Sequence, residues 1–178
     1  MRERQLIGQR YQNGFTLIEL LVTLSVASIL LSVAAPSYRT FVQDNLLVTQ
    51  SSSFYSTLAL AKSEAIRRSS FVTVCPSTNG TSCTGGVVWS NGWLVFSDRN
   101  NNGVVEAGEE ILQVGVAFSG GNSFSGARAR VTFTANGFSM ASNDTFTLCD
   151  SRGAAYSKAI ILNNQGRFRI ETGAGTCG

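Results

Sequence analysis

The sequence predicts an α+β protein of 178 residues in which one long N-terminal helix, membrane-spanning in its first half, packs on an antiparallel β-sheet. Three observations support this prediction. Residues 15–35 are almost entirely apolar, residues 47–65 carry apolar or small side chains at helical spacing, and the period changes to two after Ser70. Since the chain has no internal repeat and no low-complexity linker, its length fits one domain with a helical anchor.

The N-terminus has the charge and length pattern of a membrane anchor. The first fourteen residues carry Arg2, Arg4 and Arg10 against Glu3, and a basic stretch ahead of an apolar run stays on the cytoplasmic side. The apolar run Phe15–Ala35 has 21 residues, close to the roughly 20 that cross about 30 Å of hydrocarbon. No small-residue cleavage site follows it, so we expect the helix to be retained and the rest of the chain to lie outside the inner membrane.

Glu19 is the one ionisable side chain in this apolar run. A carboxylate inside a spanning helix costs roughly 2.5–3.5 kcal/mol on insertion scales, so such residues are functional by default. If the chain were cut after Gly14, the new amino group of Phe15 would supply a nearby cation, in the same chain or in a neighbouring subunit. The alternative is a glutamate tolerated at the membrane interface near the end of the helix.

The start of the apolar run resembles the type IV prepilin signature without departure: Gly14-Phe15-Thr16-Leu17-Ile18-Glu19-Leu20-Leu21-Val22. The resemblance implies that a prepilin peptidase cuts after Gly14 and that Phe15 becomes the N-methylated terminus. It also implies that Glu19 pairs with the N-terminus of a neighbouring pilin during assembly. The chain then divides into a leader (1–14), a transmembrane and filament-core helix (15–36) and a periplasmic pilin-like globular domain (37–178).

Helical periodicity continues beyond Pro36, which removes a backbone donor and is expected to bend the helix. A proline at this place also resembles the helix-kinking proline of pilins. Apolar or small residues then recur at spacings of four and three: Leu47, Ser51, Phe54, Leu58, Ala61 and Ala65. We therefore expect one helix from about Phe15 to Arg68, roughly 80 Å long, whose second half buries this stripe against the sheet.

Short segments rich in β-branched and aromatic residues follow, separated by Gly, Asn, Ser and Asp. They predict strands at 71–75, 87–89, 92–96, 110–114, 130–134, 145–149, 158–162 and 167–170. The segment Asn163-Asn164-Gln165-Gly166 suits a hairpin turn between the last two. Trp89 and Trp93 are assigned to the core rather than to a ligand site.

An even number of cysteines behind a membrane-targeting segment indicates disulfides formed in an oxidising compartment. The four are Cys75, Cys83, Cys149 and Cys177, which allow three connectivities. We favour Cys75–Cys83, which closes a short Pro/Gly/Ser/Thr loop, and Cys149–Cys177, which ties the C-terminal tail to a strand. Four unpaired buried thiols are the alternative.

The globular part resembles the FimT/GspH branch of minor pilins and pseudopilins. The residues that carry the resemblance are Cys75-Pro76 with Cys83, and segments 92–96 (GWLVF), 98–103, 146–153 (FTLCDSRG) and 166–169 (GRFR). It implies a non-enzymatic minor subunit near a filament tip, with other pilin subunits as partners. Two filaments remain open, a type IV pilus and a type II secretion pseudopilus, because the N-terminal physics is the same in both.

Arg167 and Arg169 are the candidate ligand-binding residues. In a strand they point to the same face, with Phe168 on the other, and a guanidinium offers phosphate two parallel charge-assisted hydrogen bonds. Further basic residues that could extend this patch are Arg152, Lys158, Arg128 and Arg130. The motif resembles the Gly-Arg-x-Arg element of FimT-type pilins, which implies DNA binding for uptake in natural transformation. A solvated edge strand whose charges discourage aggregation is the alternative.

A second motif fits the calcium-loop pattern, with Asp98, Asn100, Asn102 and Glu109 as candidate ligands. Strand patterns on both sides argue against an EF-hand, and an Asn/Gly-rich hairpin loop is the alternative. The sequence contains no histidine, which removes Ser-His-Asp and Cys-His catalysis. We therefore expect no enzymatic activity and no cofactor.

Overall fold

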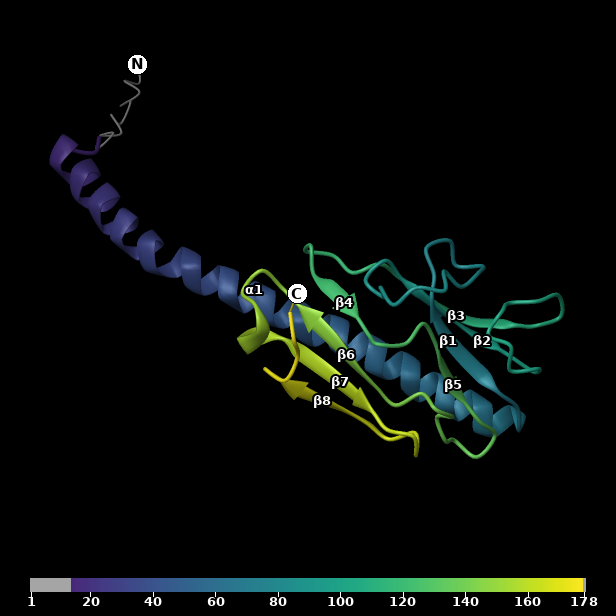
Figure 1. Cartoon of the computed structure of the whole chain (residues 1–178). Coiled ribbons are helices and arrows are strands. Elements are labelled where there is room, and N and C mark those ends of the chain that lie inside the picture. Colours follow the sequence, from purple (N-terminus) through teal and green to yellow (C-terminus); the bar gives the residue numbers. More distant parts are fainter. Residues whose placement is uncertain (1–13, 178) are drawn as a thin grey trace, which may run out of the picture. The chain divides into compact units, whose positions relative to one another are not determined.

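The computed structural model describes residues 14–177 and divides into two compact units, a helical segment that ends at Phe41 and a globular unit that begins at Val42. One continuous helix, α1 (Leu17–Arg68), runs through both (Figure 1). Its observed bounds confirm the helix expected from the sequence to within two residues. The expected leader, apart from Gly14, lies outside the described residues.

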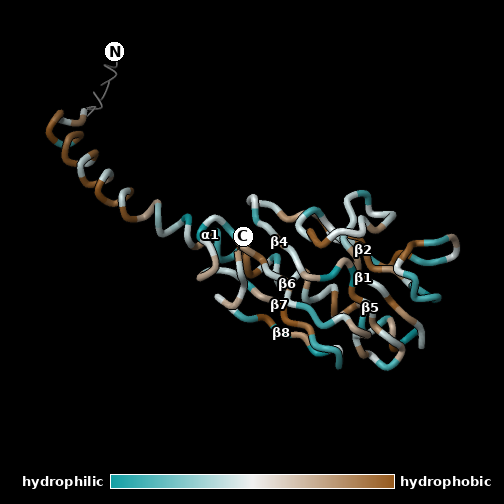
Figure 2. The backbone as a smooth tube through the Cα atoms, in the orientation of Figure 1, coloured by the Kyte–Doolittle hydropathy of each residue, from teal (hydrophilic) through white to brown (hydrophobic). Residues whose placement is uncertain are grey.

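The helical segment begins with a cap. The Thr16 hydroxyl accepts a hydrogen bond from the N–H of Glu19 at 3.3 Å, which satisfies one of the free donors at the start of α1. The helix continues past Pro36 without a break, and the Thr40 hydroxyl donates to the Pro36 carbonyl at 3.2 Å. Figure 1 shows this first part of α1 as curved, and Figure 2 shows that it is mostly hydrophobic.

In the globular unit, α1 buries the stripe that the sequence predicts. The buried positions are Leu47, Gln50, Ser51, Phe54, Thr57, Leu58, Ala61 and Ala65. Residues three and four apart lie on one side of a helix, so the stripe forms a continuous contact face. The helix ends where Ser69 takes a φ of 48°, and the N–H of Ser70 turns back to the Ala65 carbonyl at 3.2 Å.

Two four-stranded antiparallel sheets make up the rest of the unit. The first has the order β3-β2-β1-β5 and contains β1 (Val72–Pro76), β2 (Trp93–Ser97), β3 (Ile111–Gly115) and β5 (Val131–Phe133). The second has the order β4-β6-β7-β8 and contains β4 (Ser123–Ser125), β6 (Asp144–Cys149), β7 (Lys158–Leu162) and β8 (Phe168–Thr172). A 3-10 helix, η1 (Ala154–Tyr156), precedes β7.

One expected strand is wrong and one observed strand was not expected. Residues 87–89 form no strand; Val88 only bridges Ser125, and the N–H of Trp89 donates to the Phe124 carbonyl at 2.8 Å. The partner in both contacts is β4, a three-residue strand in a Gly/Ser-rich stretch with one apolar side chain. Such a short strand has no alternating pattern to read. The separation into two sheets was also not predicted, because it depends on long-range pairing.

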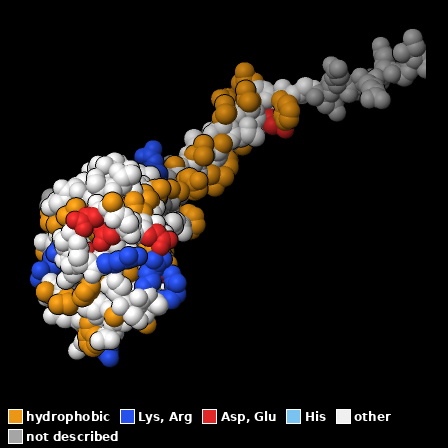
Figure 3. All heavy atoms as spheres, turned by 90° about the vertical axis from the view of Figure 1, so that its right-hand side faces the viewer, with side chains coloured by type: hydrophobic (Ala, Val, Ile, Leu, Met, Phe, Trp, Pro, Cys, Tyr) orange, Lys and Arg blue, Asp and Glu red, His pale blue; other side chains and the backbone are white. Residues whose placement is uncertain are grey.

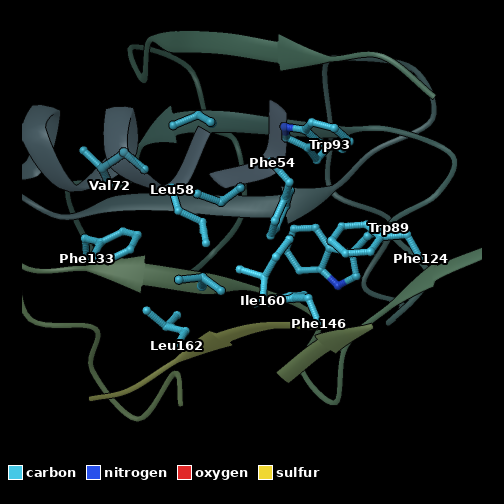
Figure 4. Close-up of a cluster of buried hydrophobic side chains, with 14 of the residues drawn as sticks. Phe54, Leu58, Val72, Trp89, Trp93, Phe124, Phe133, Phe146, Ile160 and Leu162 are labelled. Atoms are coloured by element: carbon cyan, nitrogen blue, oxygen red, sulfur yellow. The ribbon is translucent and has the colours of Figure 1, made fainter. Parts of the chain in front are cut away.

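The core lies where α1 meets both sheets. Phe54 is fully buried and makes ring contacts with Trp89, Trp93, Phe124 and Phe146, with centroids 4.8–5.4 Å apart (Figure 4). Rings at these separations add to the stabilisation from buried area alone. All buried hydrophobic side chains among the described residues belong to the globular unit, which therefore has a complete core of its own.

Both disulfides have the connectivity favoured from the sequence. Cys75 pairs with Cys83 and Cys149 with Cys177. The first belongs to a smaller cluster with Leu94 and Phe96 on the other face of the first sheet. The second joins β6 to the C-terminal tail, so the residues after β8 are held against the domain.

Candidate functional site

The helical segment presents a largely apolar surface. Every described side chain from Phe15 to Phe41 is exposed, and the segment contains a window of mean hydropathy 2.3, long enough to cross a membrane. Figure 3 shows this segment as largely hydrophobic with acidic atoms near its start, and Glu19 is the one acidic residue described before Asp44. An exposed apolar surface of this size requires lipid or neighbouring helices to cover it.

The second candidate site is the β7–β8 hairpin, and the Asn163–Gly166 turn sets its geometry. The Asn163 side-chain oxygen accepts from the N–H of Gln165 at 3.1 Å and from the N–H of Arg167 at 3.0 Å, as asparagine does in tight turns. Gly166 has a φ of 67°, and a Cβ there would lie 2.0 Å from the Gly137 carbonyl oxygen. Both the backbone conformation and the close approach therefore require glycine at this position.

The turn leads directly to the two arginines. Arg167 is exposed, and its guanidinium makes no ion pair with any of the residues that the structure describes. Arg169 lies in β8 opposite Ile161 and pairs with Glu171 at 2.7 Å, while its side chain stays 63% exposed. Phe168, between them, contacts the Tyr55 ring at 4.7 Å and so faces α1. Phe168 therefore faces the helix, as the sequence predicts, while Arg169 on the neighbouring position is exposed.

Lys62 adds a third basic side chain beside this hairpin. It projects from α1, and its Nζ donates to the Gly166 carbonyl at 2.8 Å. A groove of about 470 Å³ between α1 and the start of β8 is lined by Lys62, Arg167 and the two rings of Tyr55 and Phe168. No local pattern could have indicated this, because Lys62 and Gly166 are 104 residues apart.

Arg152 does not join the exposed arginines. Its side chain is 15% exposed and lies between two carboxylates, Asp44 at 2.8 Å and Asp150 at 2.7 Å, over the ring of Tyr156. Burial raises the pKa of Asp150, but the hydrogen bonds from Arg152 outweigh it and leave the pKa below its ordinary value. Arg152 therefore links Asp44 in α1 to Asp150, which directly follows β6 of the second sheet.

The other basic candidates are dispersed. Lys158 pairs in register with Thr172 and shares a sheet face with the buried Ile160, whereas Arg169 opposes Ile161 on the other face. The Lys158 Nζ donates to the Thr172 hydroxyl at 2.8 Å. Arg130 donates to the Asn102 carbonyl. Arg128 is exposed and donates to Asn143, whose own N–H donates to the hairpin turn.

The loop after β2 uses its acidic side chains internally. Asp98 is fully buried, and its oxygens accept from the N–H groups of Asn102 and Gly103 at 3.0 Å and from the Thr73 hydroxyl at 2.7 Å. Glu109 accepts from the N–H groups of Arg99 and Glu106. These contacts close a hairpin loop, and within residues 14–177 no cluster of three or more acidic, Cys or His side chains forms a metal site.

Two protein-family models match this chain. Residues 50–166, more than half of the chain, match the family described as type II transport protein GspH. The chain belongs to the GspH family. A second match, over residues 9–35, is to the prokaryotic N-terminal methylation motif, which contains Gly14 to Glu19. The family assignment made from the sequence is thereby confirmed.

The chain is also similar to individual proteins of the pilin type. The pilin-like protein PilA1 of Thermus thermophilus is 29% identical over 170 residues, which cover 90% of this chain and 99% of PilA1. The type IV minor pilin FimU of Pseudomonas aeruginosa has a similar fold, with a TM-score of 0.58 and 20% identity over 76% of this chain and 95% of FimU. The minor pseudopilin EpsH of the Vibrio cholerae type 2 secretion system has a TM-score of 0.51 and 12% identity over 72% of this chain and 98% of EpsH. This GspH-family chain therefore has the pilin-like fold.

Proposed function

We propose that the protein is a minor type IV pilin that binds DNA through the exposed start of its β7–β8 hairpin. In this proposal a prepilin peptidase removes residues 1–14 and Phe15 becomes the methylated terminus. Residues 15–36 hold the chain in the inner membrane and later form part of the filament core, while residues 37–178 lie in the periplasm. The chain has no catalytic role.

Assembly is assigned to Glu19 because it is the one ionisable side chain in the exposed apolar run of residues 15–35. In a filament the neighbouring helices cover that surface, and the carboxylate needs a cationic partner there. The amino terminus of a neighbouring Phe15 provides one. Glu19→Ala is therefore expected to block incorporation into sheared filaments while the globular unit stays folded.

Glu106→Ala is the matched control for this experiment, since it removes an exposed carboxylate from a loop of the globular unit. We expect Glu106→Ala to be incorporated like the wild type. Normal incorporation of Glu19→Ala would contradict the assembly role.

DNA binding is assigned to the hairpin by one observation. The Arg167 guanidinium is exposed and makes no ion pair within the described residues, and Arg169, two residues further along the hairpin, is 63% exposed. Buried or fully paired arginines have little to offer a ligand, whereas these two present donors in the fork geometry that suits phosphate. Such a site contacts the DNA backbone with little sequence preference.

The test is DNA affinity as a function of salt, measured on the purified chain in non-ionic detergent. Each phosphate contact contributes a slope of about 0.9 in the logarithmic plot of affinity against salt, so Arg167→Gln with Arg169→Gln should reduce the slope by about 2 and abolish binding at moderate salt. A double control, Arg67→Gln with Arg99→Gln, makes the same charge change at two exposed arginines away from the hairpin. Unchanged affinity in the hairpin variant would remove these residues from the site.

The second candidate function is a type II secretion pseudopilin that takes part in protein secretion without binding DNA. The family description, type II transport protein GspH, and the similarity to EpsH favour it. It becomes the preferred function if the wild-type chain binds no DNA even at low salt. The role of Glu19 in assembly is the same in both.

A further inference from the structure

A row of side chains crosses the outer face of the second sheet, starting at Arg169. Register pairs Arg169 with Ile161 in β7 and Ile161 with Thr145 in β6, so these three lie side by side across neighbouring strands. Their strand neighbours Ile160 and Phe146 are fully buried on the opposite face. The row therefore points away from α1, and its last member, Thr145, is exposed.

Beyond β6 the row reaches a surface hollow of about 490 Å³. Its lining consists of Thr145 and Ile161 from the row, together with Ala127, Asn143, Asp144, Leu162 and Asn163. The hollow also holds spare donors. Within the part of the chain that the structure describes, neither the Thr145 hydroxyl nor the side-chain amide N–H groups of Asn143 donate a hydrogen bond.

Arg128 lies in the loop between β4 and β5, next to Ala127, which lines this hollow; its own side chain lines a neighbouring hollow of about 450 Å³. Its Nε donates to the Asn143 carbonyl at 3.1 Å, and its Nη2 lies 3.4 Å from the Asn143 side-chain oxygen. A guanidinium has five N–H groups, so most of them remain available. The N–H of Asn143 donates in turn to the Asn164 side chain at 3.2 Å. Arg128 is thus tied to the same hairpin turn that positions Arg167.

Two acidic side chains lie near the row, and neither neutralises it. Asp144 is 7% exposed, and its oxygens accept from the N–H groups of Ala127, Arg128 and Thr145 at 2.7–3.0 Å. Among residues 14–177, Glu171 pairs with one arginine, Arg169. Since Arg167 and Arg128 make no ion pair among the described residues, the surface keeps a positive balance.

We propose that Arg128 is a second phosphate anchor, and that the backbone of a nucleic acid crosses the outer face of the second sheet from Arg169 to Arg128 through the hollow at Asn143 and Thr145. This inference rests on the DNA binding proposed above and extends the site beyond its two arginines. From β8 to β6 is about 10 Å. One strand of a duplex carries a phosphate per 3.4 Å of helix axis, so a duplex whose axis is parallel to the row places about three phosphates of that strand over this distance.

The test compares duplex DNA binding by full-length variants in non-ionic detergent, each checked by thermal unfolding. Arg128→Gln should lower the affinity about eightfold at 0.1 M salt and reduce the salt slope by about 0.9, as expected for one lost phosphate contact. Arg128→Lys should keep the slope because it keeps the charge. Thr145→Val, which loses a hydroxyl and no charge, should weaken binding at an unchanged slope.

Arg67→Gln is the matched control, because it removes one exposed arginine from the end of α1, and it should bind like the wild type. Equal losses in Arg67→Gln and Arg128→Gln would overturn the inference, since only general charge would matter. Loss of binding in the Arg167/Arg169 variant with unchanged affinity and slope in Arg128→Gln would overturn the second anchor alone. No binding by the wild type would overturn both.

Discussion

Replacing Arg152 tests whether this arginine holds the domain together or belongs to the DNA site. In Arg152→Gln the Asp150 carboxylate, whose side chain is 4% exposed, loses its cation. Leaving a buried carboxylate without its partner costs about 3–5 kcal/mol. We expect about 3 kcal/mol, the lower end, because Asp150 still accepts from the backbone N–H of residue 152 at 2.9 Å. That is a roughly 150-fold fall in the folding equilibrium constant.

The assay is urea unfolding of residues 37–178 with the disulfides intact, followed by the fluorescence of the buried Trp89 and Trp93. Asp44→Asn is the control. It removes the partner that is 55% exposed, so it should cost about 0–1 kcal/mol.

Adding Asp150→Asn to Arg152→Gln should recover much of the lost stability, because no buried charge is then left unpaired. DNA affinity of the folded Arg152 variant should match that of the wild type. A loss of stability below about 0.5 kcal/mol together with weaker DNA binding would refute the structural role.

Three further predictions concern stability. Phe54→Ala should cost about 3–5 kcal/mol in urea unfolding, since the ring is fully buried among four aromatic neighbours, while Tyr55→Ala on the same turn should cost clearly less. Glu64 accepts hydrogen bonds from two arginines, which lower its pKa from 4.5 to about 2; the stability it contributes is present above pH 4.5 and is lost as the pH falls towards 2, so Glu64→Gln should show a shallower acid transition. Replacing the Cys149–Cys177 pair by serine should cost about 3.5 kcal/mol and replacing Cys75–Cys83 about 2.5 kcal/mol, because the first closes the longer loop; equal losses would contradict the loop-length argument.

The features that the sequence predicted correctly depend on neighbouring residues. The stripe from Leu47 to Ala65 follows from spacing along one helix, and the β7–β8 hairpin follows from the turn chemistry of Asn163 and Gly166. Seven of the eight expected strands overlap observed ones for the same reason, since alternation and β-branched composition are local signals. The two favoured cysteine pairs, Cys75–Cys83 and Cys149–Cys177, are the observed disulfides.

What the sequence could not predict depends on contacts between distant segments. Arg152 was expected to extend a basic patch, but Asp44, more than a hundred residues earlier, is close enough to pair with it. Lys62 donates to Gly166, which is 104 residues away in the sequence. Arg128, in the loop between β4 and β5, donates to Asn143. Charge and proximity in sequence cannot separate a structural arginine from an available one; burial and ion pairing do so.

The most direct test of the filament assignment is the mass of the N-terminal peptide of the protein isolated from sheared filaments. We expect a chain that begins at Phe15 with a methylated amino group, because only a cut after Gly14 creates the cation that Glu19 needs. A functional, filament-associated form that still carries residues 1–14 would contradict it.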